Sequence, residues 1–155
     1  MATIYLLEAH HRARDGLKIL LETESDLQLV GESAQAAGII HHLERLQPDL
    51  LIAGLTMDAL ELEMIREITA RRLKTRVIVL SLSADEQLIK RALDHGVAGF
   101  VLKEHGGSAV SAAIRSVLAG RIYIQFTERT EEFHDGDGSK SSIGYDPAQK
   151  ASPYH

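Results

Sequence analysis

Polar residues stand where short apolar runs of the chain end. Glu8 follows the first run, Ser81 ends the fourth and Lys103 follows the fifth. Ala9 and Gly54 hold comparable positions but carry no polar side chain. A carboxylate, a hydroxyl and an ammonium group in one place can bind a polar ligand or one another. Because an unpaired, partly buried lysine is costly, we expect Lys103 to pair with Glu8.

These residues meet if the apolar runs are parallel strands of one sheet. The runs cover residues 4–7, 27–31, 50–53, 76–80 and 99–102, and helical stripes follow each of them. This alternation predicts an α/β fold with a five-stranded parallel sheet, five helices and right-handed crossovers. In such a sheet the carboxyl ends of the strands border one crevice, where the strand order reverses.

Two of the expected helices have clear sequence signals. The first has an apolar stripe formed by Ala13, Leu17, Leu20 and Leu21. The fourth is expected to open at a capping box made by Ser83 and Glu86 and to end at Gly96.

The composition is that of an ordinary globular protein with an acidic balance. The chain has 155 residues, of which 45% are hydrophobic and 25% charged, and its formal net charge is −5. An acidic chain has no global field that attracts nucleic acid. No apolar run approaches the ~18 residues that span a bilayer, and the start lacks the positive segment of a signal peptide. We therefore expect a cytoplasmic protein that binds neither nucleic acid nor membranes.

Other functional sites find little support in the sequence. Without cysteine there is no disulfide, thiolate metal site or cysteine nucleophile. The histidines include the adjacent pairs His10-His11 and His41-His42, but no pair has the i, i+4 spacing of a zinc helix. Ser81 lacks a nearby base and the glycines of a nucleophile elbow. We therefore expect no metal site, no cofactor and no enzymatic activity.

The character of the chain changes from residue 125. Residues 125–155 combine glycines, prolines and polar runs without sustained periodicity. We therefore predict one domain over residues 1–124 and a flexible tail over residues 125–155.

Several stretches within about residues 3–124 resemble the receiver domain of two-component response regulators, of the NarL/LuxR type. The most specific are residues 92–103, which end in Gly99-Phe100-Val101-Leu102-Lys103, and residues 118–121, Leu-Ala-Gly-Arg. The others are residues 14–17, 30–34, 47–52 and 75–81. The resemblance implies a CheY-like, flavodoxin-like fold, with a doubly wound sheet of five parallel strands.

The resemblance also implies a degenerate phosphorylation pocket. The acidic pair that helps to hold magnesium in the family falls on Glu8 and Ala9, and the phosphate-accepting aspartate falls on Gly54. The hydroxyl and lysine positions fall on Ser81 and Lys103. Glycine has no side chain to phosphorylate, and one glutamate is a poor site for magnesium, which needs several oxygen ligands. We expect magnesium binding to be weak or absent.

Neighbouring residues complete the comparison with the family. Phe100 falls at the position of its aromatic switch. Asp58, four residues beyond Gly54, is expected to lie in a loop or to cap a helix, and Asp49 lies at the wrong end of its strand. Neither aspartate replaces the missing acceptor.

The sequence therefore predicts a pseudo-receiver that acts by phosphorylation-independent contact with a protein partner or a second copy. In the family, the fourth helix, fifth strand and fifth helix form the usual docking face. On this chain that face would include Gln87, Arg91, Asp94, Phe100 and Arg115.

Two alternatives stay open. In the first, the chain is a small-molecule-sensing module in which Glu8 and Lys103 recognise a polar ligand. In the second, it is the receiver part of a LuxR-type transcription regulator. Residues 126–129 are similar to the opening of a helix-turn-helix domain, but the rest of the tail lacks the core of a complete one.

Overall fold

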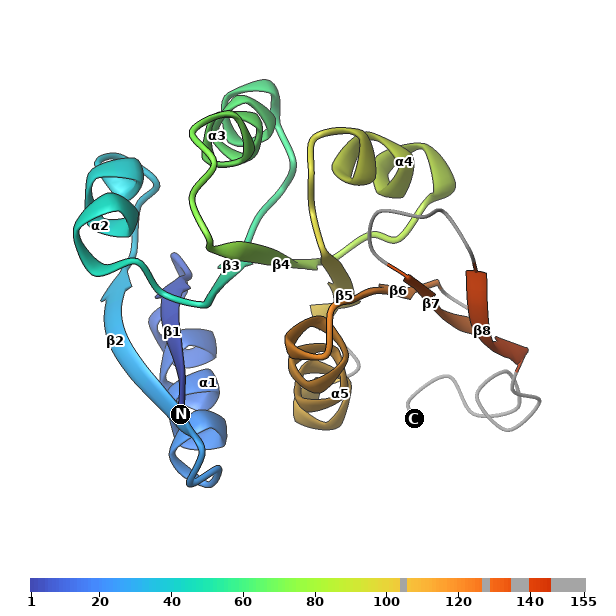
Figure 1. The fold of residues 1–155 in the computed structure, drawn as a ribbon, viewed down its shortest axis with the longest axis horizontal. Helices are drawn as coiled ribbons and strands as arrows, with labels where there is room; N and C mark the ends of the chain where they lie inside the picture. The colour runs from blue at the N-terminus through green and yellow to red at the C-terminus, as the bar shows by residue number, and fades with distance from the viewer. Residues whose placement is uncertain (104–105, 127–128, 135–139, 146–155) are drawn as a thin grey trace.

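The fold is an α/β arrangement built on one continuous sheet (Figure 1). A computed structural model describes residues 1–103, 106–126, 129–134 and 140–145. The sheet has eight strands in the order β2-β1-β3-β4-β5-β6-β7-β8. The strands are β1 (Ala2–Leu7), β2 (Leu27–Ser33), β3 (Leu50–Gly54), β4 (Arg76–Ser81), β5 (Gly99–Leu102), β6 (Arg121–Gln125), β7 (Arg129–His134) and β8 (Lys140–Tyr145).

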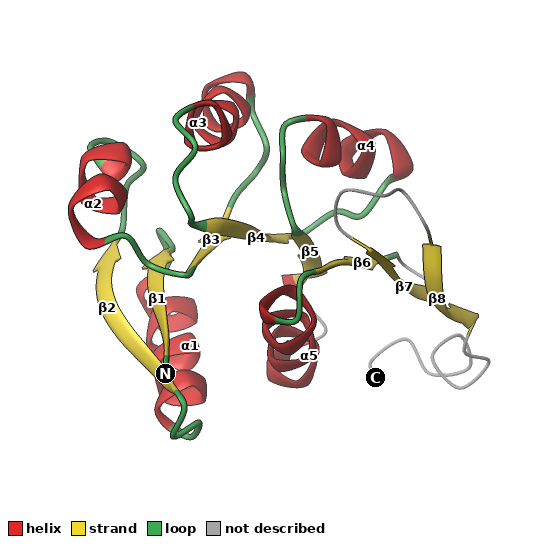
Figure 2. Cartoon of the chain, viewed as in Figure 1, coloured by secondary structure: helices red, strands yellow, loops and turns green. Residues whose placement is uncertain are grey.

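Five helices cover the two faces of the parallel part of the sheet (Figure 2). They are α1 (His11–Glu22), α2 (Ile39–Leu46), α3 (Ala59–Ala70), α4 (Glu86–Asp94) and α5 (Gly106–Leu118). Helices α1 and α5 lie on one face, and α2, α3 and α4 lie on the other (Figure 1). Among the described residues, none of these helices has the length and apolar character needed to cross a bilayer.

The core has two layers because successive strand residues point to opposite faces. In β3, Leu51 packs in the layer beneath α2, α3 and α4, whereas Ile52 packs in the layer that contains Val110 and Ile114 of α5. Both strand residues are wholly buried. This double burial explains why the strands are continuous apolar runs.

The structure confirms the CheY-like α/β architecture with its parallel strands and five helices, but it corrects the expected number of strands. Strands β1 to β6 pair with one another in parallel, and β7 and β8 continue the sheet through antiparallel pairs, β6 with β7 and β7 with β8. Strand β6 forms because Tyr123 and Ile124 are buried on opposite faces, in the two separate core layers.

The added strands occupy part of the span in which the sequence predicts a flexible tail. Gln125 ends β6, and the β7–β8 hairpin continues the sheet from there. The flexibility expected for the rest of the tail stays a prediction, because residues 127–128, 135–139 and 146–155 lie outside the described residues.

Helix α4 begins later than the sequence predicts. Its N-cap is Asp85, whose side chain accepts a hydrogen bond of 2.8 Å from Leu88 N. The expected capping box between Ser83 and Glu86 is therefore wrong, because a nearer carboxylate satisfies the free backbone donor. Gly96 has a φ of 100° just beyond the helix, as expected of a residue that ends one.

Candidate functional site

The carboxyl ends of four neighbouring strands, β1, β3, β4 and β5, border one crevice of about 310 Å³. Its lining includes all five residues singled out at the strand ends: Glu8, Ala9, Gly54, Ser81 and Lys103. The parallel pairing of the strands brings these five residues together, since all four strands end at the same edge of the sheet.

Glu8 and Lys103 form an ion pair across this crevice. Lys103 Nζ lies 2.8 Å from Glu8 Oε1, and the glutamate side chain is only 1% exposed against 21% for the lysine. The contact is close in distance but lacks hydrogen-bond geometry, and Oε1 has no hydrogen-bond donor within the described residues. The other oxygen, Oε2, accepts a hydrogen bond of 3.1 Å from His10 N. The carboxylate is thus anchored on one side and held only by charge on the other.

Gly54 leaves the space that the Glu8 carboxylate fills. A Cβ atom added to Gly54 would lie 2.2 Å from Glu8 Oε1, 2.8 Å from Glu8 Cδ and 3.1 Å from Lys103 Nζ. The first two separations are shorter than real contacts of a Cβ atom. The carboxylate that faces Lys103 therefore belongs to Glu8, which follows β1. It occupies the space into which a side chain at position 54, at the end of β3, would extend.

The other two strand-end residues contribute little charge to the crevice. Ser81 is 2% exposed, and its Oγ accepts a hydrogen bond of 3.2 Å from Ser83 N in the turn that follows β4. Ala9 is exposed and offers no oxygen from its side chain. At the strand ends, the Glu8–Lys103 ion pair is therefore flanked by the hydroxyl of Ser81, which is already bonded to Ser83 N.

The nearby aspartates have structural partners outside the crevice. Asp58 caps α3 by accepting a hydrogen bond of 2.8 Å from Glu61 N, which confirms the expected capping role. Asp49 lies at the opposite end of β3, where it accepts a hydrogen bond of 2.8 Å from Thr3 N. Neither side chain lines the crevice.

The chain matches the model of a known family. Residues 4–115 match the response regulator receiver domain. The chain belongs to the response regulator receiver domain family.

Relatives of this receiver are of the NarL/LuxR type. It is 31% identical to the nitrate/nitrite response regulator protein NarL of Escherichia coli, over 79% of this chain and 57% of the relative. It is 30% identical to the response regulator protein VraR of Staphylococcus epidermidis, over 79% of this chain and 59% of the relative. The transcriptional regulatory protein DegU of Brevibacillus brevis is 24% identical over 98% of this chain and 68% of the relative. The chain thus spans 57% to 68% of the length of these curated relatives.

Solved structures show the same fold. A LuxR-family two-component response regulator from Aurantimonas sp. SI85-9A1 superposes with a TM-score of 0.73 at 25% identity, covering 81% of this chain and 89% of that one. The signal receiver domain of a putative response regulator NarL from Mycobacterium tuberculosis has a TM-score of 0.72 at 22% identity, covering 77% of this chain and 98% of that one.

The side chains of this receiver do not fit a magnesium ion of the kind its family implies. Glu8 is the one acidic strand-end residue of the crevice, and the ammonium group of Lys103 stands against its Oε1. Ala9 and Gly54 supply no carboxylate. A divalent cation prefers several hard oxygen ligands. Glu61 also lines the crevice, but its Oε1 already accepts hydrogen bonds from Thr56 N and Met57 N, and Glu8 stands against the positive charge of Lys103.

Phe100, predicted to hold the position of the aromatic switch, lies inside the domain. Phe100 is 0% exposed and pairs in register with Ile124 of β6, and both side chains belong to the same core layer. Beyond them, Gln125 Oε1 accepts a hydrogen bond of 2.9 Å from Leu102 N. Strand β5 is therefore an interior strand, paired with β6 at Gly99 and Phe100 and joined to it at Leu102 through Gln125.

The residues predicted for a docking face do not share one surface. Gln87, Arg91 and Asp94 are exposed on α4. Arg115 lies on α5, on the opposite face of the sheet (Figure 1), where its guanidinium holds Asp26 at 2.6 Å and Glu24 at 3.1 Å. Its hydrogen bond to Asp26 lowers the pKa of that carboxyl. Phe100 is buried, and strands β6 to β8 continue the sheet beyond β5, between the α4 and α5 faces.

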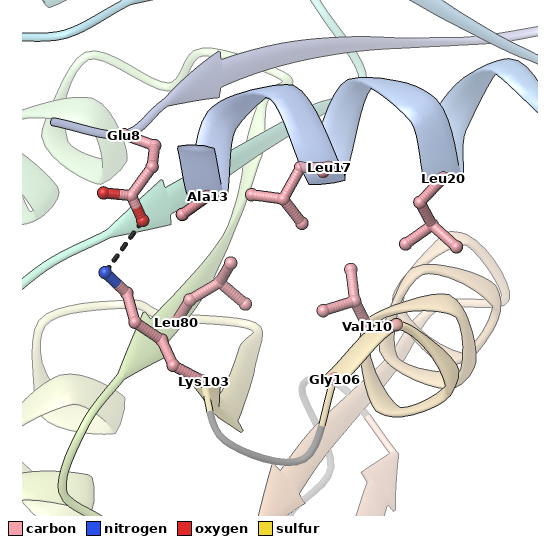
Figure 3. A pocket seen from close by; sticks show the side chains of 10 residues that line it. Glu8, Ala13, Leu17, Leu20, Leu80, Lys103, Gly106 and Val110 are labelled. Carbon is pink, nitrogen blue, oxygen red and sulfur yellow. Dashed lines mark ion pairs between the residues drawn. The ribbon is translucent and has the colours of Figure 1, made fainter. Parts of the chain in front are cut away.

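A second cavity borders the same ion pair and was not foreseen from the sequence. It has a volume of about 280 Å³ and lies between α1 and α5 (Figure 3). Leu17 and Leu20, expected to form the buried stripe of the first helix, line it together with Leu80 and Val110. The available signal was the small size of Gly106 and Gly107 opposite that stripe.

Proposed function

We propose that this receiver works without phosphorylation, by contact with a protein partner. The observation that supports this most directly is that Gly54 has no side chain and that the Glu8 carboxylate occupies the space beside it, so that a side chain at position 54 would require Glu8 to move. The acceptor position carries no nucleophile, and its space already holds a carboxylate from another strand.

The charge balance of the Glu8–Lys103 pair supports the same proposal. In phosphoryl transfer the protein neutralises the charge of the phosphoryl group with cations. Here the cation of Lys103 already faces an internal carboxylate at 2.8 Å. An incoming phosphoryl group would have to displace that carboxylate, which is 1% exposed and anchored through its other oxygen.

The added strands support a receiver with one persistent shape. Phe100 is enclosed by Ile124, and the end of β5 is tied to β6 through Gln125. Moving the aromatic ring outward would require β6 to leave the sheet. Signalling would then depend on whether the partner is present. The proposed contact surface is the exposed face of α4, which carries Gln87, Arg91 and Asp94.

The test is exposure of the full chain to acetyl phosphate and magnesium, followed by intact-mass analysis. We expect no gain of a phosphoryl group, because the position of the acceptor offers no oxygen. A phosphorylated species at high occupancy, mapped to the crevice, would overturn the proposal.

The matched variant places an aspartate at all three positions, as Glu8→Asp, Ala9→Asp and Gly54→Asp. The shorter acid at position 8 is needed because Gly54→Asp alone would collide with Glu8. A mass gain in this variant and none in the native chain would show that the side chains, and not the shape of the crevice, prevent phosphorylation.

A further inference from the structure

The cavity between α1 and α5 has apolar walls and one polar end (Figure 3). Leu17 and Leu20 face it from α1, and Val110 faces it from α5. Glu8 and Lys103 close one end, with their ion pair turned toward the cavity. Its volume of about 280 Å³ equals roughly nine water molecules in the liquid and lies at the lower limit of ordinary ligand pockets.

Gly16 is one of the α1 residues that line this cavity. It stands inside the helix and lines the cavity, and a Cβ atom added to it would meet nothing within 4 Å. Glycine in a helix interior is destabilising relative to alanine. No contact among the described residues requires glycine here, so this position has space for a larger side chain at the border of the cavity.

The polar end lacks one hydrogen-bond donor. Glu8 Oε1 is buried and has no donor within the described part of the chain, although Lys103 Nζ lies 2.8 Å away. A buried acceptor without a donor is unfavourable. A hydroxyl or carboxamide group at this end could donate to Oε1 and accept from Nζ at once.

We infer that this cavity binds a small neutral amphipathic molecule, with an apolar body between α1 and α5 and a hydroxyl or carboxamide group against the Glu8–Lys103 pair. The ligand is neutral because the pair already balances its own charge. A carboxylate would stand beside Glu8, and an ammonium group beside Lys103, so either would meet a like charge. The inference does not rest on the absence of phosphorylation, since the cavity and the crevice are separate lined spaces.

The test uses the ¹⁵N-labelled full chain, titrated with hexanamide and 1-hexanol and followed by amide NMR shifts. We expect saturable shifts at residues 16, 17, 106, 107 and 110, with a dissociation constant of about a millimolar, as befits a ligand of this size. Hexanoate and hexylammonium should bind several-fold more weakly than hexanamide.

Gly16→Leu fills the cavity from α1 and should weaken hexanamide binding by tenfold or more. The matched control is Ala112→Leu, which adds the same side chain to an exposed position of α5 that does not line the cavity. Melting curves of both variants show whether each is folded.

Three results would overturn the inference. The first is the absence of saturable shifts with either neutral probe, and the second is equal binding by Gly16→Leu and the native chain. The third is tighter binding of a charged probe, which would refute the assigned class of ligand. These readouts are independent of the mass analysis with acetyl phosphate, so either proposal can fail alone.

Discussion

The Glu8 carboxylate occupies the space beside Gly54. Its side chain starts at the end of β1 and its carboxylate reaches the space above Gly54, at the end of β3. The sequence predicts the pairing of Glu8 with Lys103 and the missing acceptor. It does not reveal that the two are sterically linked, because this depends on the direction of the glutamate side chain.

Gly54→Ala tests this steric link. The added Cβ atom must displace the buried carboxylate, so we expect a loss of about 1–3 kcal/mol in the free energy of unfolding. Urea denaturation measures the loss as a lower midpoint with an unchanged slope.

The control is the same substitution in a Glu8→Asp background. The shorter side chain withdraws from the space above Gly54, so Gly54→Ala should then cost less than half as much. Equal costs in the two backgrounds would show that Glu8 is not the obstacle.

At the scale of elements, the main departure from expectation is that β5 lies inside the sheet. Strand β6 pairs with it in parallel, and the β7–β8 hairpin continues outward from β6. Further side-chain contacts attach β7 to the body of the domain. Glu132 hydrogen-bonds Ser116 of α5 and lies 3.5 Å from Arg121 Nη1.

Gln125→Ala tests the tie between β5 and β6. Without the side-chain oxygen, the buried Leu102 N–H loses its acceptor, and we expect a loss of about 1–3 kcal/mol in stability. Hydrogen exchange at Leu102 should become faster. Gln28→Ala on the exposed side of β2 is the matched control, and equal exchange at Leu102 in all three proteins would contradict the role of Gln125.

The elements up to α5 were predictable because burial on both faces makes each strand a continuous apolar run, such as Leu50-Leu51-Ile52-Ala53. Strands β7 and β8 could not be predicted in this way, because their sequences alternate polar and apolar residues only weakly. Arg129-Thr130-Glu131-Glu132-Phe133 includes two acids in succession. Burial of Thr130 and Glu131 depends on β6 and the domain beside them, which local pattern does not show. The paired Asp-Gly sequences at residues 135–138 were the hairpin signal that the prediction of a tail overlooked.

Across the whole molecule, several surface carboxylates are held in their charged form. Hydrogen bonding to Thr3 N, together with Lys74, lowers the pKa of Asp49. Lys18 lowers the pKa of Glu32 in the same way. A carboxyl whose pKa is lower in the folded state stabilises the fold above its unfolded pKa, and this contribution disappears as the pH falls through the folded value. Acid should therefore destabilise the protein below about pH 4.

Asp49→Asn tests this dependence. Asparagine keeps an oxygen for Thr3 N but cannot titrate, so the fall in stability between about pH 6 and about pH 3 should be shallower than in the native chain. Urea midpoints at the two pH values measure the difference. Asp94→Asn on the exposed face of α4 is the control, and a slope unchanged by Asp49→Asn would contradict the assignment.

The Glu8–Lys103 pair separates two spaces, because both residues line the strand-end crevice and also the cavity between α1 and α5. An occupant that moves either side chain changes the shape of both spaces. Thermodynamic linkage then requires reciprocity: the factor by which hexanamide alters the affinity for an occupant of the crevice equals the factor by which that occupant alters the affinity for hexanamide. One ion pair would thus couple ligand binding in the two spaces.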